Sequence, residues 1–210
     1  MLDPDKNTAR PRLVLLDLGN VLVSLRPLAE AFPQEVARAG RRDPEAALVA
    51  FKRSSVFDRF ERGRAKAEEF YRGMREFFQV DLSDESLREG YNRLLGDEID
   101  GMLPVVEDIK RAGMRAAALT DTSPIHLAVL DRYAVVRALE AVIASCETGL
   151  KKPDPEAFRE AARRLGVAPG EVYFTDDLVA NVEGAREAGL RAEVFRGPED
   201  LRRKLGLRAI

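Results

Sequence analysis

The chain has 210 residues, of which 45% are hydrophobic and 33% are charged, so it can form one large domain or a core domain with a smaller insert. Its 34 basic and 36 acidic residues give a net charge of -2, which argues against a nucleic-acid or membrane-surface partner. A single cysteine, Cys146, excludes an internal disulfide, and the absence of an apolar signal segment or of an apolar run near the ~20 residues that span a bilayer favours a cytoplasmic protein.

The first predicted element is a buried strand that ends at a carboxylate. After a polar tail of residues 1–11, five of the six residues 13–18 are apolar, which is typical of a central strand in a parallel sheet. Asp17 then lies at the carboxyl end of the strand, where open α/β sheets place their chemistry. Gly19 and Asn20 allow a sharp turn beside it. Considered alone, the pattern fits equally well an aspartate that only caps a turn.

Residues 25–96 carry a helical pattern with almost no strand signal, and we expect them to form a helical cap inserted after the first strand. Helix starts are predicted at Asp43-Pro44 and at Ser83. Large side chains recur at spacings of three and four residues, which favours the buried seam of a small bundle over an exposed aromatic binding stripe. These residues are Phe57, Phe60, Phe70, Tyr71, Met74, Phe77 and Phe78.

From about residue 102 onward, predicted helices and strands alternate. The strands are residues 115–120, 141–145, 171–175 and 190–195, and the helices include residues 104–112, 155–165 and 181–188. Such alternation with short links indicates a parallel sheet with helices on both faces. The predicted fold is an α/β protein, a three-layer α/β/α Rossmann-like core of residues 12–24 and 97–210 with the cap of residues 25–96.

Polar residues gather at the carboxyl ends of four predicted strands: Asp17, Thr120, Ser145 with Lys152 after it, and the pair Asp176-Asp177. Such a group of charges is costly to bring together unless a cation and an anion lie among them. Carboxylate oxygens suit Mg²⁺, and a hydroxyl with an ammonium suits a phosphoryl group. The residues therefore predict magnesium-dependent phosphoryl transfer, although two solvated loop lysines explain Lys151-Lys152 equally well.

Four segments in order resemble the motifs of the haloacid dehalogenase (HAD) superfamily, in its phosphatase branch with a helical cap. The match extends from about residue 12 to residue 195. The cap stretch 57–63 (FDRFERG) is similar to the sugar-phosphate phosphatases of this branch, especially the α-D-glucose-1-phosphate phosphatase-like group. The four segments are residues 17–22 (DLGNVL), 119–122 (LTDT), 145–155 (SCETGLKKPDP) and 172–177 (VYFTDD), the last followed by residues 181–189.

The resemblance implies a HAD-like hydrolase that cleaves a small phosphate ester, expected to be a sugar phosphate, through an aspartyl-phosphate on Asp17. It also implies that Mg²⁺ is held by Asp17, the Gly19 carbonyl and Asp177, with Asp176 in support. Thr120, the backbone NH of Asp121, and Lys152 would bind the phosphoryl group. The oligomeric state is open between a monomer and a homodimer.

Two positions depart from the pattern of the family. Gly19 stands where phosphatases of the family usually carry a second aspartate, the general acid and base, although the "DLGN" branch shares this glycine. Either another group protonates the leaving oxygen, or the substrate has an easy leaving group such as a sugar 1-phosphate. Asp121 stands where asparagine is usual, and its carboxylate weakens anion binding unless it points away from the phosphate.

Several further residues have a structural and a functional interpretation. His126, the only histidine, is expected to be a partly buried helix residue rather than a replacement acid, and Cys146 an inert thiol. Arg59, Arg62 and Arg64 are expected to be solvated rather than substrate-binding. Two rival functions stay open: a 2-haloacid dehalogenase, which needs no metal, and a phospho-ligand binding protein without turnover.

Overall fold

A parallel sheet forms the centre of the computed structural model, which describes residues 10–32 and 44–207. All four neighbouring strand pairs are parallel, in the order β5-β4-β1-β6-β7. The predicted α/β fold is thus confirmed, and the four strands expected after residue 102 end within one residue of their predicted bounds. The strands are β1 (Leu13–Leu16), β4 (Arg115–Thr120), β5 (Val142–Ala144), β6 (Val172–Asp176) and β7 (Arg191–Val194).

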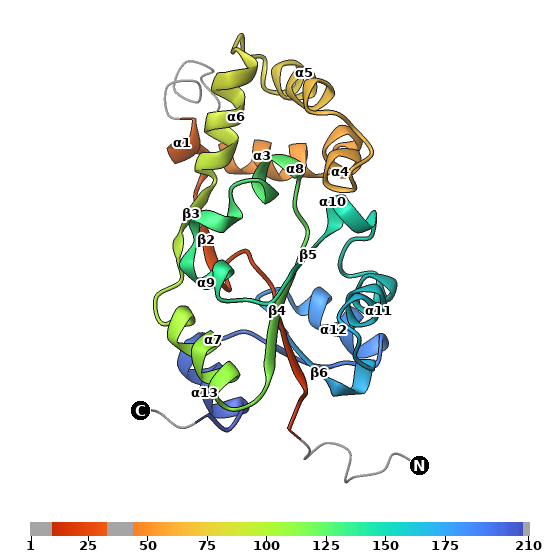
Figure 1. The fold of residues 1–210 in the computed structure, drawn as a ribbon. Coiled ribbons are helices and arrows are strands. Elements are labelled where there is room, and N and C mark those ends of the chain that lie inside the picture. The colour runs from red at the N-terminus through yellow and green to blue at the C-terminus, as the bar shows by residue number, and fades with distance from the viewer. Residues whose placement is uncertain (1–9, 33–43, 208–210) are drawn as a thin grey trace.

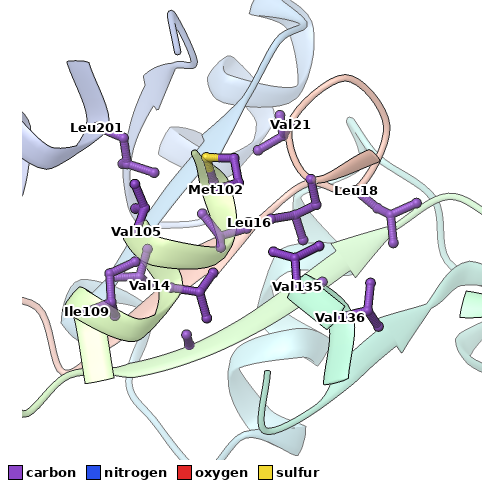
Figure 2. Close-up of a cluster of buried hydrophobic side chains, with 14 of the residues drawn as sticks. Val14, Leu16, Leu18, Val21, Met102, Val105, Ile109, Val135, Val136 and Leu201 are labelled. Atoms are coloured by element: carbon purple, nitrogen blue, oxygen red, sulfur yellow. The ribbon is translucent and has the colours of Figure 1, made fainter. Parts of the chain in front are cut away.

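Helices cover both faces of this sheet, which makes three layers (Figure 1). Because successive strand residues point to opposite faces, Val14 and Leu16 of β1 pack against one helical layer and Leu13 and Leu15 against the other. Figure 2 shows the first of these cores, with Val14 and Leu16 beside side chains of the covering helices. The first layer is α7 (Met102–Arg111), α9 (Ala134–Arg137) and α13 (Pro198–Lys204), and the second is α11 (Pro155–Arg164) and α12 (Val179–Glu187).

A group of helices lies beyond the carboxyl ends of the strands and forms the cap (Figure 1). The predicted aromatic seam is confirmed as the core of this group: Phe60 and Phe70 are at most 1% exposed and stack with ring centroids 4.2 Å apart, while Phe77 is only partly buried. The cap helices are α1 (Leu28–Ala31), α3 (Pro44–Lys52), α4 (Ser55–Glu61), α5 (Ala67–Phe78) and α6 (Asp84–Arg93).

Side-chain caps explain where two of the cap helices begin. The Ser83 hydroxyl accepts the N–H of Ser86 at 3.1 Å, as expected from the sequence, and the Ser54 hydroxyl accepts the N–H of Phe57 at 3.4 Å. The predicted N-cap Asp43 and most of the predicted tail lie outside the described residues. Among the described helices, none combines the length and the apolar character that crossing a membrane requires.

Two short strands that the sequence did not predict connect the core and the cap. β2 (Val23–Leu25) and β3 (Leu95–Glu98) pair in antiparallel fashion where the chain enters and leaves the cap (Figure 1). Gly96 and Asp97 in β3 are poor strand formers, so neither alternation nor propensity marked this segment. The expected domain boundaries near residues 25 and 96 fall on these strands. The other short elements are α8 (Pro124–Leu127), η2 (Leu130–Arg132), α10 (Ser145–Thr148) and η3 (Pro169–Glu171).

Candidate active site

Asp17 directly follows β1 and is only 7% exposed. Its N–H donates to the carbonyl of Thr175 at 3.0 Å, which continues the β1–β6 pairing and fixes the backbone at this point. The chain then turns sharply: Asn20 adopts a left-handed conformation (φ 56°), and its N–H donates to the carbonyl of Val23 at 2.7 Å. The turn leaves the Asp17 carboxylate at the edge of the sheet, beside Gly19.

The Lys152 ammonium bridges two buried carboxylates. Its Nζ contacts Asp17 Oδ1 and lies 2.7 Å from Asp176 Oδ2, and Lys152 as a whole is 8% exposed. Burial by itself lowers the pKa of an ammonium, but these two carboxylates outweigh it and hold the pKa of Lys152 above its ordinary value. Lys152 is therefore a fixed positive charge beside Asp17, whereas the alternative of a solvated loop lysine is wrong.

Three carboxylates form a cluster that suits a divalent cation. One oxygen from each of Asp17, Asp176 and Asp177 lies within 4.8 Å of the others. Asp176 is engaged on both oxygens, by Asn181 and the N–H of Leu178 at 2.9 Å each, so it orients the group more than it offers a free ligand. All the donors are hard oxygens, and a single lysine does not balance three carboxylates, so the residues fit Mg²⁺.

The ionisation of the cluster depends on its burial. Desolvation raises the pKa of the Asp17 carboxyl above its ordinary value, and the Lys152 ammonium acts in the opposite direction. Desolvation also raises the pKa of Asp177, against a hydrogen bond donated by Asn20 at 3.3 Å. A bound divalent cation favours the ionised form of both carboxyls, so metal binding and the charge needed on Asp17 support each other.

Thr120 and Asp121 come from the end of β4, the strand next to β1. Thr120 is 3% exposed and lines the same cavity as Asp17. Asp121 also lines it, and its Oδ1 accepts the backbone N–H of Lys152 at 3.1 Å. Burial raises the pKa of Asp121, while the Lys152 ammonium lowers it. The structure thus brings Thr120, Lys152 and Asp17 together as the strand ends predicted, and Asp121 lines the same cavity.

The sequence predicts Ser145 at the crevice, but in the structure it lies outside the cavity wall. It is 1% exposed. Its Oγ accepts the N–H of Thr122 at 2.9 Å and lies 2.7 Å from the carbonyl of Glu61. Ser145, the first residue of α10, therefore joins the loop after β4 to helix α4 of the cap.

The cavity above Asp17 has a volume of about 350 Å³ and is walled by both the core and the cap. The sequence pattern did not identify the cap side of this wall, since helical spacing shows which side chains pack together but not which face meets another domain. Only the FDRFERG stretch, which contains Phe57 and Glu61, pointed to it. The residues on the cap side and the hinge are Leu25, Arg26, Leu48, Lys52, Phe57, Glu61, Tyr91, Leu94 and Leu95.

Polar contacts hold the cap against the core on one side of the cavity. Glu61 of α4 pairs with Lys151 at 2.6 Å, and Arg62 donates to the carbonyl of Gly149 at 3.0 Å. Next to them, Gly63 (φ 67°) packs so tightly that a Cβ there would lie 2.1 Å from the Cys146 carbonyl oxygen. Lys151 and Lys152 therefore have separate tasks, the first in the contact with the cap and the second beside Asp17.

On the other side of the cavity, His126 of α8 stacks on Tyr91 of α6. Their ring centroids lie 3.9 Å apart, and His126 Nε2 is 2.8 Å from the Tyr91 carbonyl oxygen, so Nε2 carries the proton. Burial lowers the pKa of His126 to about 4, which leaves the ring neutral near pH 7. Its role as a protonated replacement acid is therefore not supported, and the structural interpretation is favoured.

The remaining candidates from the sequence lie away from the cavity wall. Arg59 pairs with Glu69 at 2.6 Å and Arg62 with Asp58 at 3.0 Å, and neither these two nor Arg64 lines the cavity. Burial raises the pKa of Cys146 to about 11, so its thiol stays protonated and unreactive.

The fold agrees with that of known HAD family enzymes. A HAD family enzyme from Bacteroides thetaiotaomicron has a TM-score of 0.77 and 25% identity over 93% of this chain and 98% of that one. Its complex with magnesium and inorganic phosphate has the same fold, with a TM-score of 0.71 and 24% identity over 89% of this chain and 95% of that one.

Two curated relatives match parts of the chain. Flavin mononucleotide hydrolase 1 of Arabidopsis thaliana is 28% identical over 165 residues, or 77% of this chain and 65% of that protein. The phosphoserine phosphatase of Thermus thermophilus is 35% identical over 125 residues, or 57% of this chain and 49% of that protein. The chain spans less than two thirds of the length of both. A family model described as haloacid dehalogenase-like hydrolase matches residues 11–189. The resemblance seen in the four motifs is thus confirmed, and the chain belongs to the haloacid dehalogenase-like hydrolases.

Proposed function

We propose that the chain is a magnesium-dependent phosphatase that hydrolyses a small phosphate monoester through covalent phosphorylation of Asp17. The observation that carries this proposal is the buried Lys152 ammonium between Asp17 and Asp176, next to a cluster of three carboxylates. A nucleophilic carboxylate, a fixed cation and a set of oxygen ligands are the parts that in-line phosphoryl transfer requires.

In this proposal, Asp17 attacks the phosphorus with one carboxylate oxygen, and water later releases the phosphate. Lys152 and Thr120 hold the phosphoryl oxygens, and Lys152 offsets their charge as the phosphoryl group approaches Asp17. Asp17, Asp177 and the Gly19 carbonyl would hold Mg²⁺, with Asp176 orienting the group. When bound, the cation supplies charge stabilisation for the transferring phosphoryl group. The Bacteroides enzyme, which has the same fold, was solved in complex with magnesium and inorganic phosphate, and this supports magnesium as the cation.

The substrate is set by the cap side of the cavity. A sugar phosphate is the class that the resemblance suggested. The wall also carries apolar side chains such as Leu48, Phe57 and Leu94, and one relative is named for the hydrolysis of flavin mononucleotide. Sugar phosphates, aryl phosphates and flavin mononucleotide are therefore the substrates to compare.

The test is phosphate release from this panel with Mg²⁺ and with EDTA, beside the variants Asp17→Asn and Asp131→Asn. Asp131 is an exposed aspartate outside the cavity and serves as the matched control. We expect release that needs both Mg²⁺ and Asp17 and is unchanged in the control. Release of halide from a 2-haloacid without metal would favour the dehalogenase, and tight binding of esters without turnover would favour the binding protein.

The other expectations from the sequence stay predictions. These are a cytoplasmic location, the absence of nucleic-acid and membrane partners, and a small molecule as the substrate. The near balance of 34 basic and 36 acidic residues supports the second of them.

A further inference from the structure

The side chain of Leu25 packs beside the position of the usual second aspartate. A Cβ on Gly19 would lie 3.2 Å from Cδ1 of Leu25, which comes from the hinge strand β2 and lines the cavity. A longer side chain at residue 19 would compete with Leu25 for this space. The proton donor for the leaving group must therefore come from another part of the wall.

Most titratable groups of the described wall are already engaged. Burial raises the pKa of Glu61 against the Lys151 ammonium, and its carboxylate is held in an ion pair with that ammonium at 2.6 Å. The N–H of His126 is directed at a backbone carbonyl, and the Tyr91 hydroxyl is hydrogen-bonded to Ser123. Arginine does not release its proton at neutral pH, which removes Arg26, and Lys52 is exposed.

Asp121 has the placement that a proton donor needs. Its carboxyl receives one hydrogen bond from the described residues, from the Lys152 N–H at 3.1 Å, and no ammonium or guanidinium lies within ion-pair distance of it there. It adjoins Thr120 at the phosphate end of the cavity and is near enough to Glu61 and Lys151, at the cap boundary, to influence them electrostatically. In-line attack by Asp17 directs the leaving group away from the Asp17 carboxylate and into the cavity that Asp121 also lines.

We propose that Asp121 is the general acid that protonates the leaving oxygen, and that the carboxyl absent at Gly19 is thus supplied from β4. This inference rests on the proposed phosphatase function. As the bond from Asp17 to phosphorus forms, the bond from phosphorus to the leaving oxygen breaks, and the Asp121 proton moves to that oxygen. Water then hydrolyses the aspartyl-phosphate, the bond from Asp17 to phosphorus breaks, and the phosphate leaves with both protons of that water. The Asp121 carboxylate regains its proton from solvent, so that both side chains return to their starting states. Burial, which raises the pKa of Asp121, favours the protonated form at the start; Lys152 and Lys151 oppose it, and Asp176 supports it.

The variant Asp121→Asn tests this role without removing the local hydrogen bond, because the amide Oδ1 still accepts the Lys152 N–H. Hydrolysis is measured with glucose 6-phosphate, whose alkoxide needs a proton, and with p-nitrophenyl phosphate, whose leaving group departs without one. We expect kcat for glucose 6-phosphate to fall about 10²- to 10⁴-fold and kcat for the aryl ester to change less than ~10-fold. Melting temperatures verify that the variants fold.

The matched control is Glu61→Gln, the other carboxyl of the wall near Asp121, which is expected to affect both esters to the same degree. An equal loss on both esters in Asp121→Asn, or unchanged hydrolysis of glucose 6-phosphate, would overturn the role of Asp121 while leaving the phosphatase intact. A loss confined to glucose 6-phosphate in Glu61→Gln would assign the proton to Glu61 instead. Failure of the unmodified chain to release phosphate from either ester would overturn the proposed function together with this inference.

Discussion

The core and the cap contribute to one cavity in different ways. On the core side, the key side chains lie at the ends of adjacent parallel strands: Asp17 follows β1, Thr120 ends β4 and Asp177 follows β6. On the cap side, Lys52, Phe57 and Tyr91 lie on three separate helices, α3, α4 and α6. Sheet pairing fixes the first group to one another, whereas the second group depends on how each helix is rotated and how the cap docks.

The core and the cap also differ in the contacts that stabilise them. The core sheet is buried by helices on both faces, while the cap has an apolar centre of its own and meets the core near the cavity through polar contacts. The difference suggests that the core carries the chemistry and the cap carries the selection of substrate. Each of the following predictions tests this division.

The largest effect on kcat/KM is expected from substitution of Lys152, for which the adjacent Lys151 is the comparison. Lys152→Ala leaves Asp17 and Asp176 without their common cation and should lower kcat/KM by ~10³-fold or more. Lys151→Ala removes only the ion pairs with Glu61 and Asp58 of the cap and should change kcat/KM by less than ~10-fold. Steady-state hydrolysis of p-nitrophenyl phosphate measures both. Similar losses in the two variants would contradict the separation of core and cap.

The stability of the cap can be tested separately from that of the core. Phe70 is 0% exposed and packs on Phe51, Phe57 and Phe60, so Phe70→Ala should cost about 3–5 kcal/mol. Hydrogen exchange should then show faster exchange in α5 and α6 with the sheet still protected. Phe158→Ala, in the core, is the matched control and should accelerate exchange in the sheet. A uniform loss of protection in both variants would indicate one cooperative unit.

The contact between His126 and Tyr91 predicts a pH dependence of stability. The pKa of His126 is about 4 in the folded chain and ordinarily 6.5, so between these values only the unfolded chain binds the proton. The stability that comes from keeping His126 neutral is fully present above pH 6.5. It is lost as the pH falls to 4, which lowers the free energy of unfolding by about 3 kcal/mol. Denaturant unfolding should show that His126→Gln loses less stability over this range than the unmodified chain. An identical pH profile would mean that the ring is not held neutral.

The smallest effect on stability is expected from a substitution at the tight contact between Gly63 of the cap and Cys146 of the core. Gly63→Ala combines a left-handed backbone (φ 67°) with a clash against the Cys146 carbonyl oxygen. Gly113→Ala has a similar backbone (φ 81°) but nothing within 4 Å of the added Cβ, so it isolates the cost of the backbone. We expect Gly63→Ala to be less stable than the control by about 1–2 kcal/mol and to have a raised KM. Equal melting temperatures would show that the contact relaxes without cost.

The sequence by itself determined the sheet, the burial of the aromatic seam and the gathering of Asp17, Thr120, Lys152 and the Asp176-Asp177 pair. The physical reason is that apolar runs and helix boundaries are local signals, and the carboxyl ends of parallel strands meet at one edge whatever the loops do.

Only the tertiary structure decided the hinge strands, the withdrawal of Ser145 from the cavity, the packing of Leu25 beside Gly19, and the cap residues that face the substrate. These depend on contacts between segments far apart in the chain, such as Ser145 with the Glu61 carbonyl and Tyr91 with His126. Local spacing specifies which face of a helix is buried, but the docking of one domain on another is set by the sum of weak contacts across their interface, which no short stretch of sequence encodes.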